Sequence, residues 1–121
     1  MKKLSPKEEE ILTYFWKFGP MFINDLLDKQ DEPKPHYNTL STIVRILKEK
    51  EYIGYKKYGN TYQYYALITE DDYRNSSFNN IVNKFFKKSY TRMVSTLVEE
   101  EKISIEELQE LIDKIRNQSK K

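Results

Sequence analysis

The sequence contains no cysteine, and it has only three glycines and four prolines among its 121 residues. Without cysteine the chain has no disulfide, no thiolate metal site and no cysteine nucleophile. The scarcity of glycine and proline favours regular secondary structure with short connections. Long apolar runs are also absent, and no apolar segment follows Met1-Lys2-Lys3-Leu4. We therefore expect a soluble, cytoplasmic protein without membrane insertion.

The residue sets of an enzyme are missing as well. His36 is the only histidine, and a lone histidine without cysteine cannot build a metal site. Its place before a predicted helix favours a cap or a backbone contact. No Ser/His/Asp set and no glycine-rich phosphate loop occurs, and the carboxylates fall on helical faces that are usually solvated. We expect no catalytic residue, no metal, no cofactor and no enzymatic activity.

The charge is unevenly distributed although its formal net value is only +2. Basic side chains outnumber acidic ones in residues 34–64 and stand alone in 84–92, whereas acidic ones dominate residues 99–115. The basic middle of the chain could face phosphates. Charge alone, however, is equally typical of ordinary solvated faces.

Three helices are predicted in the first fifty residues. Ser5 and Glu8 form the pattern of a capping box around Pro6, and Gly19-Pro20 ends the helix that they begin. A short second helix is expected over residues 24–29. The third helix is expected over residues 37–50, after a polar connection broken by proline.

The third predicted helix has an unusual polar face. Its apolar positions, Leu40, Ile43, Val44 and Leu47, form one stripe. Asn38, Ser41, Thr42 and Arg45 follow at i, i+3, i+4 and i+7 and therefore share another face. Small uncharged side chains on that face allow the helix to lie close against a partner.

A β-hairpin is predicted after the third helix. Residues 53–57 and 62–67 are β-prone and rich in tyrosine, and Gly59-Asn60 between them can supply the positive φ angles of a tight turn. Three helices followed by a hairpin is the order of a winged helix-turn-helix. In that fold the third helix enters the major groove and the hairpin tip touches the DNA backbone.

The remaining residues predict two further helices with long apolar stripes. Thr69 caps one helix, whose stripe runs from Phe78 to Val98, and a capping box at Ser104 begins the other. The winged module already has a core, so we favour a two-fold dimer over folding back onto the same chain. The aromatic residues of the stripe, Tyr90 included, could also be interpreted as a ligand pocket, but a core or dimer interface is more typical. The predicted dimerisation residues are Phe78, Ile81, Val82, Phe85, Phe86, Met93, Leu97, Leu108, Leu111, Ile112 and Ile115.

The fold class expected is therefore mainly α with a small β wing. A winged helix-turn-helix over residues 1–68 would bind double-stranded DNA, and residues 69–121 would form a helical dimerisation region. Asn38 can pair with adenine, and Arg45 can pair with guanine or phosphate. The predicted DNA-binding residues are Tyr37, Asn38, Thr39, Ser41, Thr42, Arg45, Lys56, Lys57 and Asn60.

The chain resembles the penicillinase-repressor family (BlaI/MecI type), which also includes copper-responsive relatives. The resemblance runs from Leu4 to about Ile115. It is most specific in three segments: Phe15-Trp16 at the end of the first helix, the Thr39-x-x-Thr42 pattern within residues 38–50, and the Tyr62-Gln63-Tyr64-Tyr65 strand that leads into Thr69-Glu70-Asp71-Asp72.

This resemblance implies a homodimeric repressor that binds an inverted-repeat operator upstream of resistance or stress genes. It also implies a membrane sensor-peptidase whose signal leads to cleavage of the repressor. Ile46 stands where the family usually has arginine, and Glu51 where it usually has glycine. Neither the Asn-Phe cleavage bond near residues 97–101 nor the cysteine-rich copper tail is present. Two alternatives remain: a ligand- or stress-responsive winged-helix regulator without a cleavage step, and a winged helix used for protein interaction.

Overall fold

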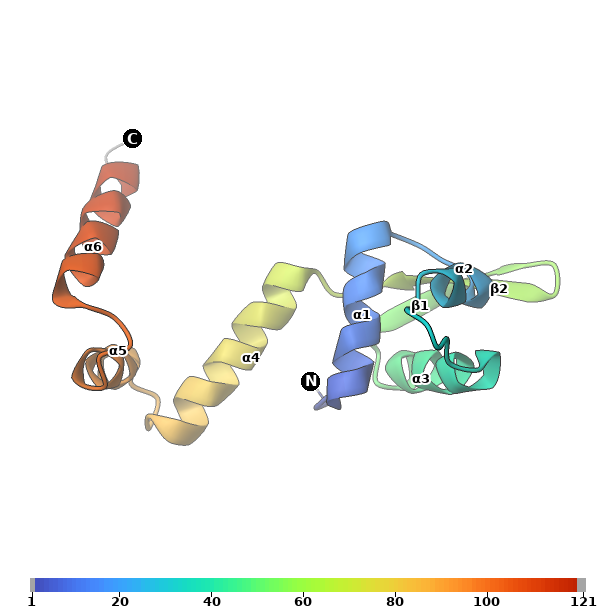
Figure 1. Ribbon diagram of the computed structural model, residues 1–121, viewed down its shortest axis with the longest axis horizontal. Helices are drawn as coiled ribbons and strands as arrows, with labels where there is room; N and C mark the ends of the chain where they lie inside the picture. The colour runs from blue at the N-terminus through green and yellow to red at the C-terminus, as the bar shows by residue number, and fades with distance from the viewer. Residues whose placement is uncertain (1, 120–121) are drawn as a thin grey trace. The chain divides into compact units, whose positions relative to one another are not determined.

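The computed structural model describes residues 2–119, which form six helices and one two-stranded antiparallel sheet (Figure 1). The order confirms the expected fold class, a winged helix-turn-helix followed by a helical region. The elements are α1 (Pro6–Phe18), α2 (Ile23–Asp28), α3 (Tyr37–Glu49), β1 (Ile53–Tyr58), β2 (Thr61–Ala66), α4 (Glu70–Phe85), α5 (Tyr90–Glu99) and α6 (Ile105–Ser119).

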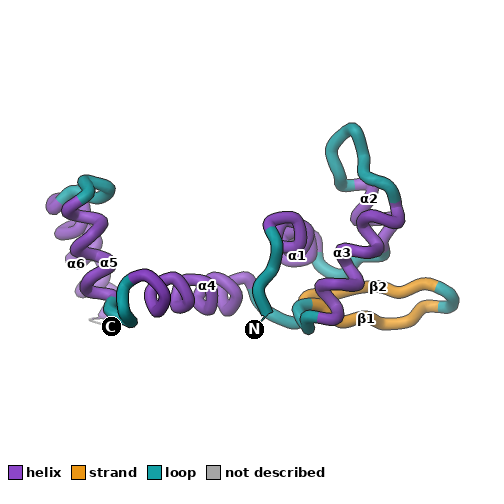
Figure 2. The backbone as a smooth tube through the Cα atoms, turned by 90° about the horizontal axis from the view of Figure 1, so that it is seen from below, coloured by secondary structure: helices purple, strands orange, loops and turns teal. Residues whose placement is uncertain are grey.

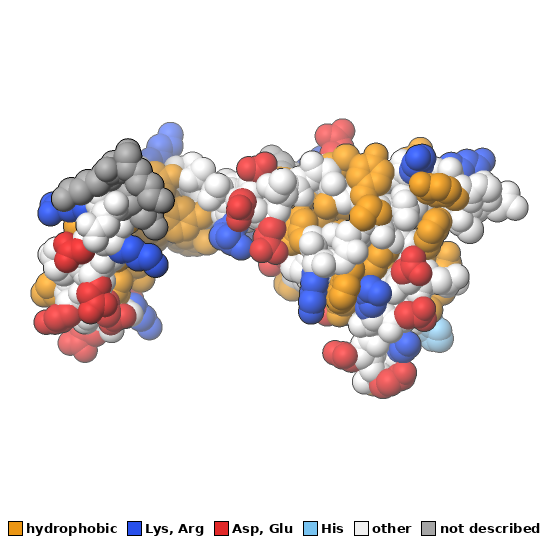
Figure 3. All heavy atoms as spheres, turned by 90° about the horizontal axis from the view of Figure 1, so that it is seen from above, with side chains coloured by type: hydrophobic (Ala, Val, Ile, Leu, Met, Phe, Trp, Pro, Cys, Tyr) orange, Lys and Arg blue, Asp and Glu red, His pale blue; other side chains and the backbone are white. Residues whose placement is uncertain are grey.

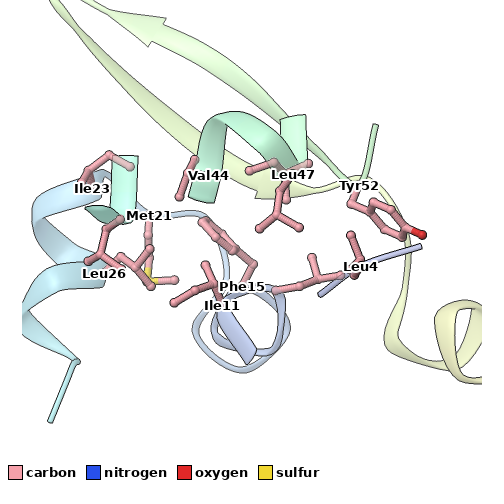
Figure 4. Close-up of a cluster of buried hydrophobic side chains, with 12 residues drawn as sticks. Leu4, Ile11, Phe15, Met21, Ile23, Leu26, Val44, Leu47 and Tyr52 are labelled. Atoms are coloured by element: carbon pink, nitrogen blue, oxygen red, sulfur yellow. The ribbon is translucent and has the colours of Figure 1, made fainter. Parts of the chain in front are cut away.

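The core of the winged module lies between α1, α2, α3 and the hairpin. Figure 4 shows Phe15 of α1 lying against Val44 and Leu47 of α3. Each fully buried leucine or isoleucine side chain contributes about 1.5–3 kcal/mol to folding. The buried residues of this cluster are Leu4, Ile11, Leu12, Phe15, Met21, Ile23, Leu26, Leu40, Val44, Leu47, Tyr52 and Ile53.

The predicted capping box at the start of α1 is confirmed. Ser5 Oγ accepts a hydrogen bond from the Glu8 backbone N–H, and Glu8 Oε1 accepts one from the Ser5 N–H, both at 3.2 Å. Lys50 Nζ lies 2.6 Å from Glu8 Oε1 and also donates to the Lys3 carbonyl at 2.9 Å. The hydrogen bond from Lys50 is the main reason that the pKa of Glu8 lies below its ordinary value. This contact joins the start of α1 to the end of α3.

A Schellman motif ends α3. The Glu51 N–H donates to the Lys48 carbonyl and the Tyr52 N–H to the Leu47 carbonyl, both at 3.0 Å. Glu51 occupies the left-handed position of this motif, with φ of 66°. Glycine is the usual residue there because it has no Cβ. The motif turns the chain so that buried Tyr52 enters the core and the first wing strand begins at the next residue, Ile53.

Replacing Glu51 with glycine is expected to raise the free energy of unfolding by about 0.5–1 kcal/mol. The left-handed conformation costs a non-glycine residue about 1–2 kcal/mol, and the extra entropy of glycine in the unfolded chain offsets about half of that. Urea denaturation checks the prediction. Glu49→Gly, in the last turn of α3, is the matched control and should destabilise by about 1 kcal/mol. Equal destabilisation by both variants would contradict the assigned strain.

The wing has the predicted strands with a correction at its turn. Tyr58 pairs with Thr61, which leaves Gly59 and Asn60 as a two-residue loop. Of these two residues only Gly59 has positive φ, at 59°, so the expectation that Asn60 shares it was wrong. A two-residue turn with glycine first needs positive φ only at that glycine. On its other edge β2 exchanges two hydrogen bonds with Met21, through Tyr64, at 2.8 and 2.9 Å.

The first turn of α4 belongs to the winged module. Thr69 Oγ1 accepts a hydrogen bond from the Asp72 N–H at 3.1 Å, which confirms the predicted cap. The ring of Tyr73 packs against those of Trp16 and Tyr52, and its hydroxyl donates to Glu9 Oε2 at 2.5 Å. The chain accordingly divides into compact units after Arg74.

The helix predicted from Thr69 through Val98 is divided in two, and this corrects the sequence interpretation. Lys87 and Lys88 adopt left-handed φ angles of 49° and 64° between α4 and α5. Ser89 then caps α5 by accepting a hydrogen bond from the Arg92 N–H at 3.1 Å. A run of left-handed residues cannot continue a right-handed helix, so the apolar stripe is shared by two helices. The capping box at Ser104 and Glu107 is present as predicted.

Candidate nucleic-acid interface

The polar residues predicted on the third helix lie together on its outer face. Leu40, Val44 and Leu47 are fully buried and hold the opposite face of α3 on the core. Tyr37, Asn38, Thr39, Thr42 and Arg45 are exposed, and Ser41 is half-buried. Figure 2 shows α3 running beside the hairpin. The first turn of α3 contains no acidic residue, so the positive end of the helix dipole is not neutralised there.

Thr42 has a restricted hydrogen-bonding role. Its hydroxyl donates to the Asn38 carbonyl at 2.9 Å, one turn earlier. The hydroxyl proton is therefore used within the helix. What Thr42 can present to a ligand is a lone pair and a methyl group, which fit a base amino group or the methyl group of thymine.

His36 precedes α3 and contacts it through its backbone. The His36 carbonyl accepts hydrogen bonds from the N–H groups of Thr39 and Leu40, at 3.0 and 3.3 Å. Its side chain makes no capping hydrogen bond. Of the two roles expected from the sequence, the structure shows the backbone contact.

The two wing lysines lie on opposite faces of the hairpin. Lys57 is opposite Tyr62 and Lys56 is opposite Gln63 in the strand register, and consecutive strand residues point to opposite faces. Both side chains are exposed, and Lys56 Nζ lies 5.4 Å from the centre of the Tyr58 ring. In Figure 3, basic side chains (blue) gather beside hydrophobic ones (orange) near the hairpin tip. The lysines therefore present charge on two sides of the wing rather than as one pair.

The structure adds a group of aromatic residues that the sequence prediction missed. Tyr55 and Tyr64 are opposite each other, and Tyr62 shares their face, which is the face that turns Ile53 into the core. The Tyr55 and Tyr62 rings are 5.2 Å apart, and both lie 6.4 Å from the Tyr64 ring. The period-two spacing of these residues was the available signal. With Tyr37 of α3 they are called the inner tyrosine cluster below.

The inner tyrosine cluster lies next to a basic side chain of α3. Lys48 Nζ lies 4.9 Å from the centre of the Tyr55 ring. Tyr64 is half-buried, and desolvation, followed by its three tyrosine neighbours, raises the pKa of its phenol. The Tyr64 hydroxyl thus stays protonated at neutral pH and remains a hydrogen-bond donor.

No group of three or more metal-ligating side chains comes together within residues 2–119. The helices of the described chain are too short or too polar to cross a bilayer.

A recognition helix without an acidic residue in its first turn, next to a two-stranded wing with two exposed lysines, defines a winged-helix DNA-binding protein. Comparison with known families identifies it further. The model of the penicillinase repressor family matches residues 4–117, and the chain belongs to that family. Its members are transcriptional repressors and not enzymes, which confirms the resemblance and the non-enzymatic class expected from the sequence.

Individual relatives cover nearly the whole chain. The methicillin resistance regulatory protein MecI of Staphylococcus aureus (strain N315) is 29% identical over 112 residues, which are 90% of this chain and 89% of the relative. The penicillinase repressor of Bacillus licheniformis is 28% identical over 117 residues, 92% of this chain and 90% of the relative. The penicillinase repressor of Staphylococcus aureus is 25% identical over 120 residues, covering 98% and 95%.

Proposed function

We propose that this chain is a cytoplasmic, homodimeric repressor that binds an inverted-repeat operator in double-stranded DNA and controls antibiotic-resistance or stress genes. The observation that carries this proposal is the outer face of α3, where Asn38, Thr42 and Arg45 are exposed while the opposite face is buried. The relatives named for methicillin resistance and penicillinase repression support the choice of genes.

In this proposal α3 lies in the major groove with its exposed face against base edges. Asn38 can pair with adenine through its amide, and Arg45 can reach guanine or a phosphate. Thr42 contributes its methyl group and one lone pair. The wing residues Lys57 and Asn60 contact the backbone, which positions the module without reading sequence.

The exposed apolar faces of the C-terminal helices support a dimer. Among the described residues 75–117 only Val82 is buried, whereas Phe85 is 66% and Ile105 70% exposed. Between α5 and α6 lies an open apolar groove of about 500 Å³, lined in part by Val94, Val98 and Leu108. A second copy of the chain supplies apolar surface of matching size and gives the two-fold symmetry that an inverted repeat requires.

We propose that repression is relieved by a sensor-triggered event such as proteolysis, with a membrane sensor-peptidase as the source of the signal. Because the Asn-Phe bond is missing near residues 97–101, cleavage would use another bond. Incubating the protein with such a peptidase and mapping fragments by mass spectrometry tests this step. An intact chain that leaves its operator on adding a small ligand would instead support the regulator without cleavage.

Replacing Asn38 or Thr42 with alanine is expected to reduce discrimination between operator and random DNA by about 1–3 kcal/mol for each half-site. Each change removes groups that face base edges, while the buried side of α3 stays intact. Competition binding with a duplex selected from a random pool and a scrambled duplex measures the ratio.

Thr13→Ala on α1 is the matched control, because the exposed Thr13 hydroxyl also donates to a carbonyl of the preceding turn, that of Glu10 at 2.5 Å. It should leave the ratio unchanged. If Asn38→Ala and Thr42→Ala also leave the ratio unchanged, these residues do not read bases.

A further inference from the structure

We propose that the inner tyrosine cluster, together with Lys48, binds the phosphates of one DNA backbone strand where the inner face of the wing adjoins α3. This rests on the proposed DNA binding and deepens it, because it assigns the contacts to neutral phenol groups and not only to the wing lysines. The alternative ligand of exposed aromatic rings is an unpaired base stacked on them, and the test below distinguishes the two.

The tyrosines of the cluster are more exposed than a tyrosine that packs in the core. Tyr52 is only 3% exposed, and its hydroxyl donates to the Lys2 carbonyl. Tyr55 and Tyr62 remain 49% and 41% exposed. Within residues 2–119 their hydroxyls make no hydrogen bond with another protein group. The hydroxyl groups of Tyr55 and Tyr62 are thus positioned at the surface by ring contacts and can donate hydrogen bonds to an external acceptor.

The position of the cluster selects the backbone over the bases. Tyr55, Tyr62 and Tyr64 project from the face of the hairpin that turns toward the core side, and Lys48 and Tyr37 come from α3. When a helix lies in the major groove and the wing lies outside it, the DNA backbone strand that borders the groove lies between them. Backbone phosphates are the acceptors that such a strand presents to hydroxyl and ammonium donors.

The chemistry of the donors distinguishes this site from one made of lysines. A protonated phenol donates a hydrogen bond to a phosphate without changing the charge of the complex. A lysine neutralises the phosphate and releases a counterion, so it increases the dependence of affinity on salt. Of the cluster and its neighbour Lys48, only Lys48 should contribute to the salt dependence.

The test compares two double variants of the 121-residue chain. Tyr55→Phe/Tyr62→Phe removes two inner hydroxyls and keeps both rings. Tyr58→Phe/Tyr65→Phe is the matched control on the opposite face of the hairpin, where both rings are also exposed. Binding is measured by fluorescence anisotropy at several salt concentrations, with a selected duplex, a scrambled duplex and a single-stranded oligonucleotide. Thermal melting verifies that each variant is folded.

We expect the inner variant to lose affinity for both duplexes by the same factor, on the order of 20-fold for each half-site, at unchanged salt slope. The outer variant should bind as the wild type. Lys48→Gln should reduce the salt slope by about 0.9 for each half-site.

Several results would overturn the proposal while leaving DNA binding intact: wild-type affinity of the inner variant, a loss limited to the selected duplex, an equal loss in the outer variant, or a loss limited to the single strand. If the wild type itself binds neither duplex, the proposed function fails together with this inference. The two failures are therefore distinguishable by the wild-type measurement.

Discussion

Replacing Phe85 with aspartate is expected to leave the protein monomeric and to lower operator affinity on the order of 100-fold. Phe85 is two-thirds exposed near the end of α4, beside exposed Ile81. Covering such a ring with a second copy stabilises a dimer by about 1.5–3 kcal/mol, and a carboxylate at the same place would be desolvated without a partner. A monomer holds one half-site only and loses the effective concentration that links two modules. Light scattering and operator titration measure both effects.

Asn83→Asp is the control for the added charge, because Asn83 is an exposed polar residue of the same helix. That variant should remain dimeric and bind the operator as the wild type does. A dimer that survives Phe85→Asp at micromolar concentration would show that the apolar face of α4 is not the interface. The winged module should melt normally in both variants, because residues 83 and 85 lie beyond Arg74, where that compact unit ends.

Replacing Leu47 with alanine is expected to lower the free energy of unfolding by about 2–5 kcal/mol. Leu47 is fully buried on the inner side of α3 and lies against Phe15 of α1 (Figure 4). Its removal leaves a cavity under the last turns of the helix, just before the Schellman motif. Urea denaturation at one fixed protein concentration measures the loss, and the fixed concentration is needed because dimerisation contributes to apparent stability.

Arg45→Ala is the matched comparison from the exposed face of the same helix. It should leave the midpoint of unfolding nearly unchanged and reduce DNA affinity. Leu47→Ala should do the opposite under conditions in which the variant is still folded. If both variants changed stability and DNA binding in parallel, the division of α3 into a packing face and a binding face would be wrong.

Local signals in the sequence were sufficient for most elements of the winged module. Ser5 and Glu8 predicted the start of α1 because a capping box involves only residues three apart. The β-prone, tyrosine-rich residues 53–57 and 62–67 on either side of Gly59-Asn60 predicted the hairpin, because its turn also involves only neighbouring residues. The buried and exposed faces of α3 also followed from residue spacing alone. These predictions succeeded because the interactions that they describe lie within one turn or one hairpin.

In residues 69–98 the local sequence pattern was not sufficient to predict the helices correctly. The apolar spacing of α4 continues into α5, so periodicity indicated one helix across Lys87 and Lys88. Nothing in the spacing marks these two lysines as left-handed, because lysine is an ordinary helix former. Their conformation is visible only in the folded chain, where Ser89 begins a new helix.

The sequence by itself determined the order of the elements, the faces of α3 and the family of repressors to which the chain belongs. The tertiary structure alone decided which residues from separate elements meet: Lys48 with Tyr55 and Tyr73 with Trp16 and Tyr52 through their side chains, and Met21 with Tyr64 through their backbones. The physical reason is range. Capping, turns and amphipathic spacing depend on residues a few positions apart. The period-two spacing of Tyr55, Tyr62 and Tyr64 places them on one face of the hairpin, but it does not record how that hairpin packs against Lys48 of α3.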